Sequence, residues 1–186
     1  MHILLNKTPF KPYANLIQLI GFQLVWFAWA LGVPAGLLWP GLVASVAFLA
    51  LHGLWQPSAR IDREAVLWSV LCGLGLDSAL MHLDLLSFAL PNPDPLAGLQ
   101  PWWMGLLWAC LGCTLHHSLA WLKPRPLLAA GLGGVSGVLS YEAAARMGAL
   151  SLPQPELAWP LLAVFWAVFV PWIQRPKAQT RVESLR

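Results

Sequence analysis

The stretch LAWPLLAVFWAVFVPWI, residues 157–173, contains no charged residue and is followed directly by Gln174 and Arg175. A helix needs about 20 mainly apolar residues to cross the hydrocarbon core of a bilayer. With its flanks, this stretch reaches that length and predicts a membrane-spanning helix over residues 156–174. Five further stretches of the chain have the same character, and we expect a helix in each. Their ranges are 14–31, 35–55, 65–89, 101–122 and 126–150.

The composition supports a membrane protein throughout. Of the 186 residues, 58% are hydrophobic and only 10% are charged, whereas soluble domains carry about 25% charged residues. Twelve Trp residues fit the aromatic belts found at membrane boundaries. A β-barrel needs alternating apolar and polar residues, and the chain lacks them. We therefore predict an all-α, polytopic bundle of six helices that forms a single membrane domain over residues 1–186.

Basic residues predict the orientation of this bundle. With six helices, ten of the eleven Lys and Arg residues fall on one side. The positive-inside rule then places both termini in the cytoplasm, and we expect a multi-pass membrane protein. The ten residues are Lys7, Lys11, Arg60, Arg63, Lys123, Arg125, Arg175, Lys177, Arg181 and Arg186.

Several other classes of protein are disfavoured. The charges are too dispersed for a nucleic-acid surface, so the expected partners are the lipid bilayer and other membrane proteins. The cysteines Cys72, Cys110 and Cys113 lie in apolar segments and do not form a secreted disulfide framework. The CLGC motif at 110–113 has redox spacing, but its position within the membrane favours helix packing. No nucleotide or flavin motif occurs, and we expect no cofactor.

Polar residues inside the membrane identify a candidate site in the outer half of the bundle. Asp77 lies near the middle of the third predicted helix, where an ionisable group is costly without a partner. With Tyr141 and Glu142 it is our candidate catalytic group. Five further residues are candidates for ligand binding in the same layer: Ser78, His82, Asp84, Ser140 and Arg146. The alternative is structural, with Glu142 and Arg146 paired at i, i+4 and Asp77 either protonated or bonded to Ser and Thr hydroxyl groups.

A second polar layer is expected in the inner half. Its members are Asn15, Gln18, His52, Thr114, His116, His117 and Ser118. Three histidines suggest a metal or haem, but adjacent His116 and His117 point about 100° apart on a helix. We therefore expect hydrogen bonds between helices there and no metal.

Four of these stretches resemble a family of bacterial inner-membrane proteins, domain of unknown function 2878. They are GFQLVWF (21–27), GLGLDSALMHLDLLSF (73–88), TLHHSLAWL (114–122) and GVLSYEAAARMGAL (137–150). Two positions depart from the family pattern, which favours Asn at His116 and Pro at Val138. The resemblance implies an inner-membrane location and no established activity. It also suggests lipids, because genes for fatty-acyl modification often neighbour those of family members.

Three functions remain open from the sequence. The first is an enzyme or accessory factor acting on a lipid or other apolar substrate, with Asp77, Tyr141 and Glu142 as its acid–base groups. The second is a small-molecule or ion carrier subunit, for which Gly73 and Gly75 would allow local unwinding beside Asp77. The third is a structural or assembly protein whose polar residues only join helices.

Overall fold

The computed structural model describes residues 13–55 and 59–175 of the chain, which form six α-helices and one short β-ribbon. The helices are α1 (Ala14–Gly32), α2 (Trp39–Trp55), α3 (Ala59–His82), α4 (Trp102–Thr114), α5 (Pro126–Arg146) and α6 (Pro155–Ile173). Strands β1 (Ser87–Phe88) and β2 (Leu150–Ser151) pair antiparallel. A 3₁₀ turn, η2 (Ala120–Leu122), precedes α5.

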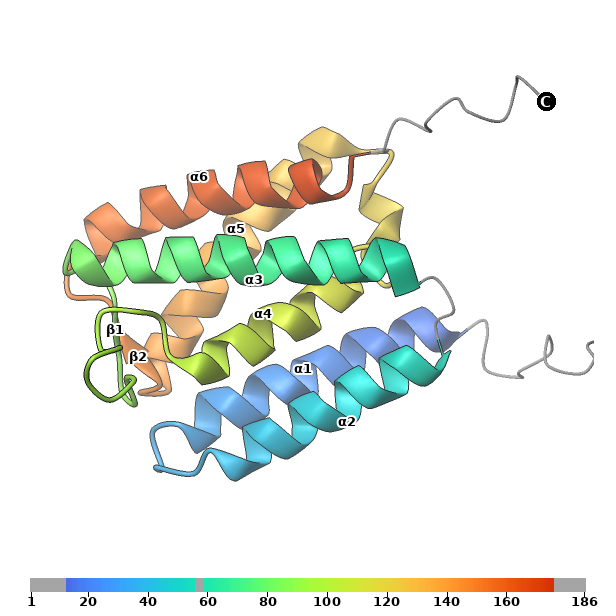
Figure 1. Cartoon of the computed structure of the whole chain (residues 1–186). Helices are drawn as coiled ribbons and strands as arrows, with labels where there is room; N and C mark the ends of the chain where they lie inside the picture. Colours follow the sequence, from blue (N-terminus) through green and yellow to red (C-terminus); the bar gives the residue numbers. More distant parts are fainter. Residues whose placement is uncertain (1–12, 56–58, 176–186) are drawn as a thin grey trace, which may run out of the picture.

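The helices pack as three consecutive hairpins (Figure 1). The α3–α4 pair lies between the α1–α2 pair and the α5–α6 pair. The start of α1 and the end of α6 lie at one end of the bundle, together with the end of α2, the start of α3 and the link from α4 to α5. The β-ribbon lies at the opposite end. We call these the basic end and the ribbon end, because Arg63, Lys123, Arg125 and Arg175 fall at the first.

The predicted class, an all-α bundle of six helices, is confirmed. Among the described residues, α1, α5, α6 and residues Asp62–His82 of α3 are long and apolar enough to cross a membrane. Large apolar side chains such as Leu127 (88% exposed) and Val164 (65% exposed) face outward, as a lipid-facing surface requires. The helices α2 and α4 are shorter, and α4 with 13 residues is about 20 Å long.

Apart from the end of the fourth helix, four helix ends differ from the prediction by four residues or more, and one of them is the start of the second helix, at Trp39 instead of residue 35. The third helix begins before residue 65 and ends at His82, and the fifth ends at Arg146. The residues after each form the ribbon, in which Ser87 is opposite Ser151 and Phe88 is opposite Leu150. Residues with positive φ precede each strand, Asp84 at 54° and Gly148 at 83°. This pairing between distant segments stops both helices early.

The fourth helix departs most from the prediction of 101–122, because α4 ends at Thr114. Residues 115–119 form turns, and amide side chains from other helices bond to their backbone. Gln174 Nε2 donates to Leu115 O at 2.8 Å and to Leu119 O at 3.0 Å. Irregular backbone at membrane depth requires such internal partners. The inner polar residues therefore support a break in the helix.

Glycines allow the last hairpin to pack closely. A Cβ added at Gly133 would lie 2.7 Å from the Trp166 carbonyl oxygen on α6, and one added at Gly137 would overlap the Trp166 indole ring. These α5 glycines therefore allow α6 to pack closely against α5. Cys110 and Cys113 are likewise buried and unbridged within the bundle.

Candidate functional site

Asp77 is completely buried and is bonded to side chains from two other helices. The Trp108 indole of α4 donates from Nε1 to Asp77 Oδ2 at 2.9 Å. The Tyr141 hydroxyl of α5 bonds to Asp77 Oδ1. Trp108 can only donate, whereas the hydroxyl of Tyr141 can donate or accept. The Tyr141–Asp77 pair can therefore share a proton in either direction.

Gln100 completes the surroundings of Asp77 from the segment between β1 and α4. With its amide oriented to face acceptors, Gln100 Nε2 donates to Asp77 Oδ2 at 2.8 Å and to Gly73 O at 3.2 Å. The backbone N–H of Gln100 donates to Ser78 Oγ at 3.0 Å. Ser78, predicted as a ligand-binding residue, thus anchors Gln100 beside the carboxyl group.

Gly73 makes room for Trp108 one turn before Asp77. A Cβ at Gly73 would lie 2.3 Å from the Trp108 ring, far inside contact distance. The opposite face of the indole stacks on Trp166 with ring centroids 5.0 Å apart. α3 remains helical through Gly73 and Gly75, so the unwinding expected for a carrier is absent. The glycine positions the indole donor instead.

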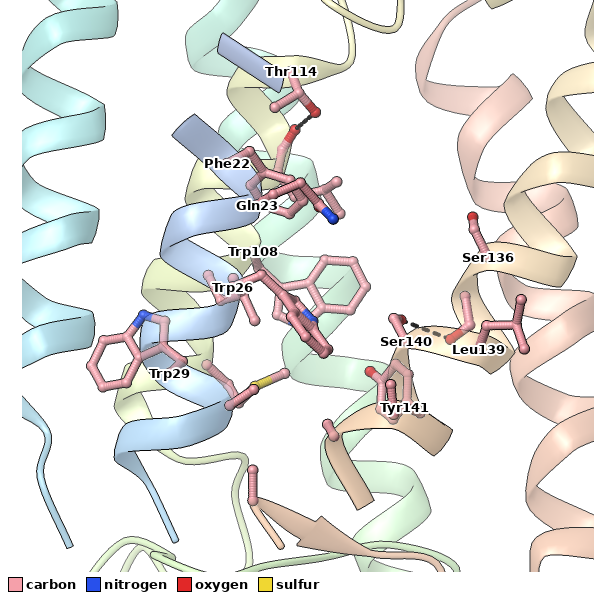
Figure 2. A pocket seen from close by; sticks show the side chains of 18 of the residues that line it. Phe22, Gln23, Trp26, Trp29, Trp108, Thr114, Ser136, Leu139, Ser140 and Tyr141 are labelled. Atoms are coloured by element: carbon pink, nitrogen blue, oxygen red, sulfur yellow. Dashed lines mark hydrogen bonds between the residues drawn. The ribbon is translucent and has the colours of Figure 1, made fainter. Parts of the chain in front are cut away.

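A pocket of about 530 Å³ lies directly beside this group of residues. Figure 2 shows Gln23 and Trp26 of α1 on one side, Ser140 and Tyr141 of α5 on the other, and Trp108 between them. Tyr141 and Trp108 thus contact both the pocket and Asp77. Its volume falls within the range of roughly 300–1,000 Å³ typical of ligand pockets.

The pocket opens sideways between α1 and α5. Gln23 on α1, together with Ser136 and Leu139 on α5, line it and are exposed. No charged side chain of the described residues lines it, and most of its wall is aromatic or aliphatic. Both flanking helices are long enough to cross a membrane. In a bilayer, the opening therefore faces acyl chains.

The other predicted residues of the outer layer lie apart from Asp77. His82 Nδ1 bonds to Ser78 O at 2.7 Å, and Asp84 is exposed after the end of α3. Ser140 donates to Gly137 O at 2.8 Å and lines the pocket. Arg146 pairs with Glu142 at 2.8 Å within α5. This pair has the i, i+4 geometry expected if Glu142 and Arg146 have a structural role.

The inner layer centres on Gln18 of α1. Its Nε2 donates to Cys113 O at 3.1 Å and faces His52 Nδ1 at 3.0 Å. Its Oε1 accepts from the Ser118 N–H at 3.0 Å. Gln18 therefore holds the backbone just before and after the break in the fourth helix.

Of the remaining inner residues, His52 and His117 form a cluster with Asp62, and the others lie outside this cluster. His117 Nε2 lies 2.8 Å from Asp62 Oδ1, and His52 Nε2 lies 3.3 Å from Asp62 Oδ2. Thr114 donates to Leu111 O at 2.7 Å. His116 is half-buried outside this cluster, and Asn15 is exposed. Two of the three inner histidines thus meet at a carboxylate.

One family model matches the chain over residues 15–172, and its description is protein of unknown function, DUF2878. That range contains all six helices except the ends of the first and last. The chain belongs to this family. It matches no curated protein and no solved structure.

Three residues at the two sites of this DUF2878 protein were not expected from its sequence: Trp108, Gln100 and Asp62. Trp108 is one of twelve tryptophans, and nothing in its own helix distinguishes it. Gln100 falls between the predicted helices 65–89 and 101–122. Asp62 falls between the predicted helices 35–55 and 65–89, whereas it lies in the first turn of α3. A third helix predicted to begin before residue 65 would have included Asp62 among the residues of the bundle.

Proposed function

We propose that this protein is a membrane-embedded enzyme or accessory factor that takes a lipid or another apolar molecule into the pocket between α1, α4 and α5. One observation carries the proposal: Tyr141, which bonds to the buried Asp77, also forms part of the pocket wall. An apolar pocket with a few convergent polar groups is the usual form of a ligand site.

The surroundings of the pocket favour a ligand from the bilayer. Its opening lies between two membrane-spanning helices, so a molecule can enter without passing through water. Its uncharged lining would make a charged headgroup costly to bury. Gln23, Ser136 and Ser140 can form hydrogen bonds with a neutral polar group such as an alcohol or ester.

Tyr141 is the group that would contact the ligand, with Asp77 behind it. In this proposal the phenol gives its proton to the ligand and recovers one from Asp77, or the two transfers run in reverse. Such a relay suits general acid–base catalysis. Trp108 and Gln100 hold the carboxyl group in place through Oδ2, which leaves Oδ1 for Tyr141.

A photoreactive fatty-acyl probe in membranes containing the protein tests the pocket. Ser136→Phe fills the pocket wall, whereas Val135→Phe adds the same ring at a neighbouring position that is 62% exposed. We expect the first change to abolish crosslinking to α1 and α5 peptides and the second to leave it intact. Equal labelling of both variants would contradict the proposal. Mass spectrometry of lipids that copurify with each variant provides an independent measurement.

A structural role is the second candidate, because every described bond of Asp77 is internal. Asp77→Asn distinguishes the two roles, since Asn keeps the volume and most of the bonds but cannot exchange a proton. A structural role predicts normal function wherever the variant accumulates. The acid–base role predicts normal accumulation and probe labelling, but failure of the variant to reverse whatever lipid change accompanies deletion of the gene.

We further propose a bacterial inner-membrane location with cytoplasmic termini. The support is the ten basic residues on one side of the six-helix arrangement and the common end of the bundle shared by the start of α1 and the end of α6. A C-terminal fluorescent-protein fusion that is bright, with an alkaline phosphatase fusion that is inactive, is the expected result. The reverse pattern would exclude this topology.

A further inference from the structure

Three side chains that can bind a metal meet at the basic end of the bundle. They are His52 near the end of α2, Asp62 in the first turn of α3 and His117 in the turn after α4. One ligand atom of each lies within 4.8 Å of the others. His117 lies 55 residues from Asp62 in the sequence, so the packing of α4 against α3 brings it to the other two residues.

Two of the cluster's ligand atoms have no hydrogen-bond partner. His52 Nε2 and Asp62 Oδ2 are buried, on side chains that are 9% and 8% exposed, and neither forms a hydrogen bond. They lie 3.3 Å apart, yet they are not aligned as donor and acceptor. Buried polar atoms are normally satisfied. A metal cation could bind both of these unpaired atoms, because imidazole nitrogen and carboxylate oxygen are metal ligands.

We propose that His52, Asp62 and His117 bind a divalent transition-metal ion, with zinc as the representative case. Zinc binds His nitrogen and carboxylate oxygen at about 2.0–2.2 Å, so tetrahedral ligands lie about 3.3 Å apart. The separation of 3.3 Å between His52 Nε2 and Asp62 Oδ2 matches that value, and His117 Nε2 lies 2.8 Å from the other carboxylate oxygen, Oδ1. Three protein ligands leave one coordination position open, as in catalytic rather than structural zinc sites.

Gln18 is the neighbouring group that tunes this site. Its amide nitrogen faces His52 Nδ1 at 3.0 Å while its other contacts hold the amide orientation. In the metal-free protein this arrangement places the His52 ring proton on Nε2. Metal binding at Nε2 moves that proton to Nδ1, where it needs an acceptor. The Gln18 amide can accept that proton only by turning its oxygen towards the ring, which breaks its bonds to Cys113 O and to the Ser118 N–H.

The surroundings allow an ion to reach the cluster. His52 and Gln18 also line a second pocket of about 250 Å³ between α1 and α2, and the His117 side chain is 13% exposed. Asp62 supplies the negative charge, and neutral imidazole is a common ligand for zinc and related metals. This inference is independent of the lipid pocket, which lies between different helices.

Titration of the chelator-treated, detergent-solubilised full-length protein with Zn²⁺ and Co²⁺ tests the proposal. We expect one ion per chain and a visible Co²⁺ spectrum typical of four-coordination. Asp62→Asn and His117→Gln should each weaken binding at least about tenfold. His116→Gln is the matched control, because His116 is adjacent to His117 and half-buried but outside the cluster. The affinity of this variant for Zn²⁺ and Co²⁺ should equal that of the wild-type protein.

A change at Gln18 tests the second step of the argument. Gln18→Glu offers a carboxylate to the His52 Nδ1–H, and we expect about tenfold tighter binding, since such outer partners alter affinity about 10–100-fold. Failure of the wild-type protein to bind either ion would overturn the proposal, as would equal affinities of the His116 and His117 variants. If the His117 variant does not accumulate, the stoichiometry and Co²⁺ spectrum of the wild-type protein decide alone.

Discussion

The two polar regions of this bundle each contain a buried aspartate, but they surround it differently. Asp77 is held by neutral donors, Trp108, Tyr141 and Gln100, beside an apolar pocket. Asp62 is held by two histidines, beside the broken backbone that follows α4. The first arrangement leaves a phenol facing a space that a ligand can enter. The second leaves ligand atoms facing one another, where an ion can enter.

The comparison shows that burial alone does not assign a role to an intramembrane acid. What differs is the neighbouring element: a pocket open to the bilayer in one case, and turns that lack helical hydrogen bonds in the other. Gln18 and Gln174 satisfy those turns. We therefore expect the Asp77 region to tolerate isosteric changes, and the turns of the inner region to lose stability when the side chain of Gln174 is truncated.

The largest effect is expected for Asp77→Ala. It removes the acceptor of three hydrogen bonds, and at about 1 kcal/mol each the free energy of unfolding should fall by about 3 kcal/mol. Asp77→Asn should cost about 1 kcal/mol, because its amide can accept from Trp108 and donate to Tyr141. Equilibrium unfolding in mixed detergent micelles measures both changes.

Asp84→Asn is the control for that measurement, since Asp84 is exposed and Asn tolerates its positive φ. We expect a change within about 0.5 kcal/mol. Equal losses for the Asn and Ala variants at Asp77 would show that the charge, rather than the bonding pattern, stabilises the region.

Gln174→Ala should have the next largest effect. It strands the carbonyl groups of Leu115 and Leu119 in a buried turn, and we expect a loss of about 2 kcal/mol. Amide hydrogen exchange should rise in residues 115–119 and stay constant around Asp77. Gln23→Ala is the control, because Gln23 is exposed. Protection of the turn in the Gln174 variant would mean that the backbone break does not depend on this side chain.

Gly73→Ala and Gly75→Ala form a matched pair on one helix. A methyl group at Gly73 overlaps Trp108, whereas one at Gly75 meets open space. Overpacking costs about 1–3 kcal/mol, and replacing a helical Gly by Ala recovers about 1 kcal/mol. We therefore expect a net loss of about 1 kcal/mol at Gly73 and a gain of up to about 1 kcal/mol at Gly75.

The same two glycine variants test whether Trp108 connects Asp77 to the pocket. Displacement of Trp108 in the Gly73 variant should also reduce labelling by the fatty-acyl probe, because Trp108 lines the pocket. Labelling of the Gly75 variant should match that of the wild-type protein. Reduced labelling in both variants would point to a general disturbance of α3.

The smallest effect is expected for Glu142→Gln. The Glu142–Arg146 pair lies on one helix, and the Arg146 side chain is 79% exposed, so its contribution should stay below about 0.5 kcal/mol. Thermal unfolding at low and high salt measures it. A larger loss would place Glu142 in the outer site, as the sequence suggested, rather than at its edge.

Sequence alone was sufficient for the class of protein and the order of its six helices. A helix in lipid forms all its backbone hydrogen bonds within its own segment. Each long apolar stretch, such as residues 157–173, therefore predicts a helix without reference to the rest of the chain. Asp77 was also recognisable, because an acid in an apolar helix is costly wherever its partners lie.

Only the tertiary structure decided which groups Asp77 and Asp62 contact. Trp108 and Tyr141 lie 31 and 64 residues from Asp77, and His117 lies 55 residues from Asp62. Such contacts depend on how far each helix extends and which face it turns towards its neighbours. The break after Thr114 has the same origin, because amides on α1 and beyond α6 supply the hydrogen bonds. Local sequence determines the helices, and packing between hairpins determines the chemistry of the site.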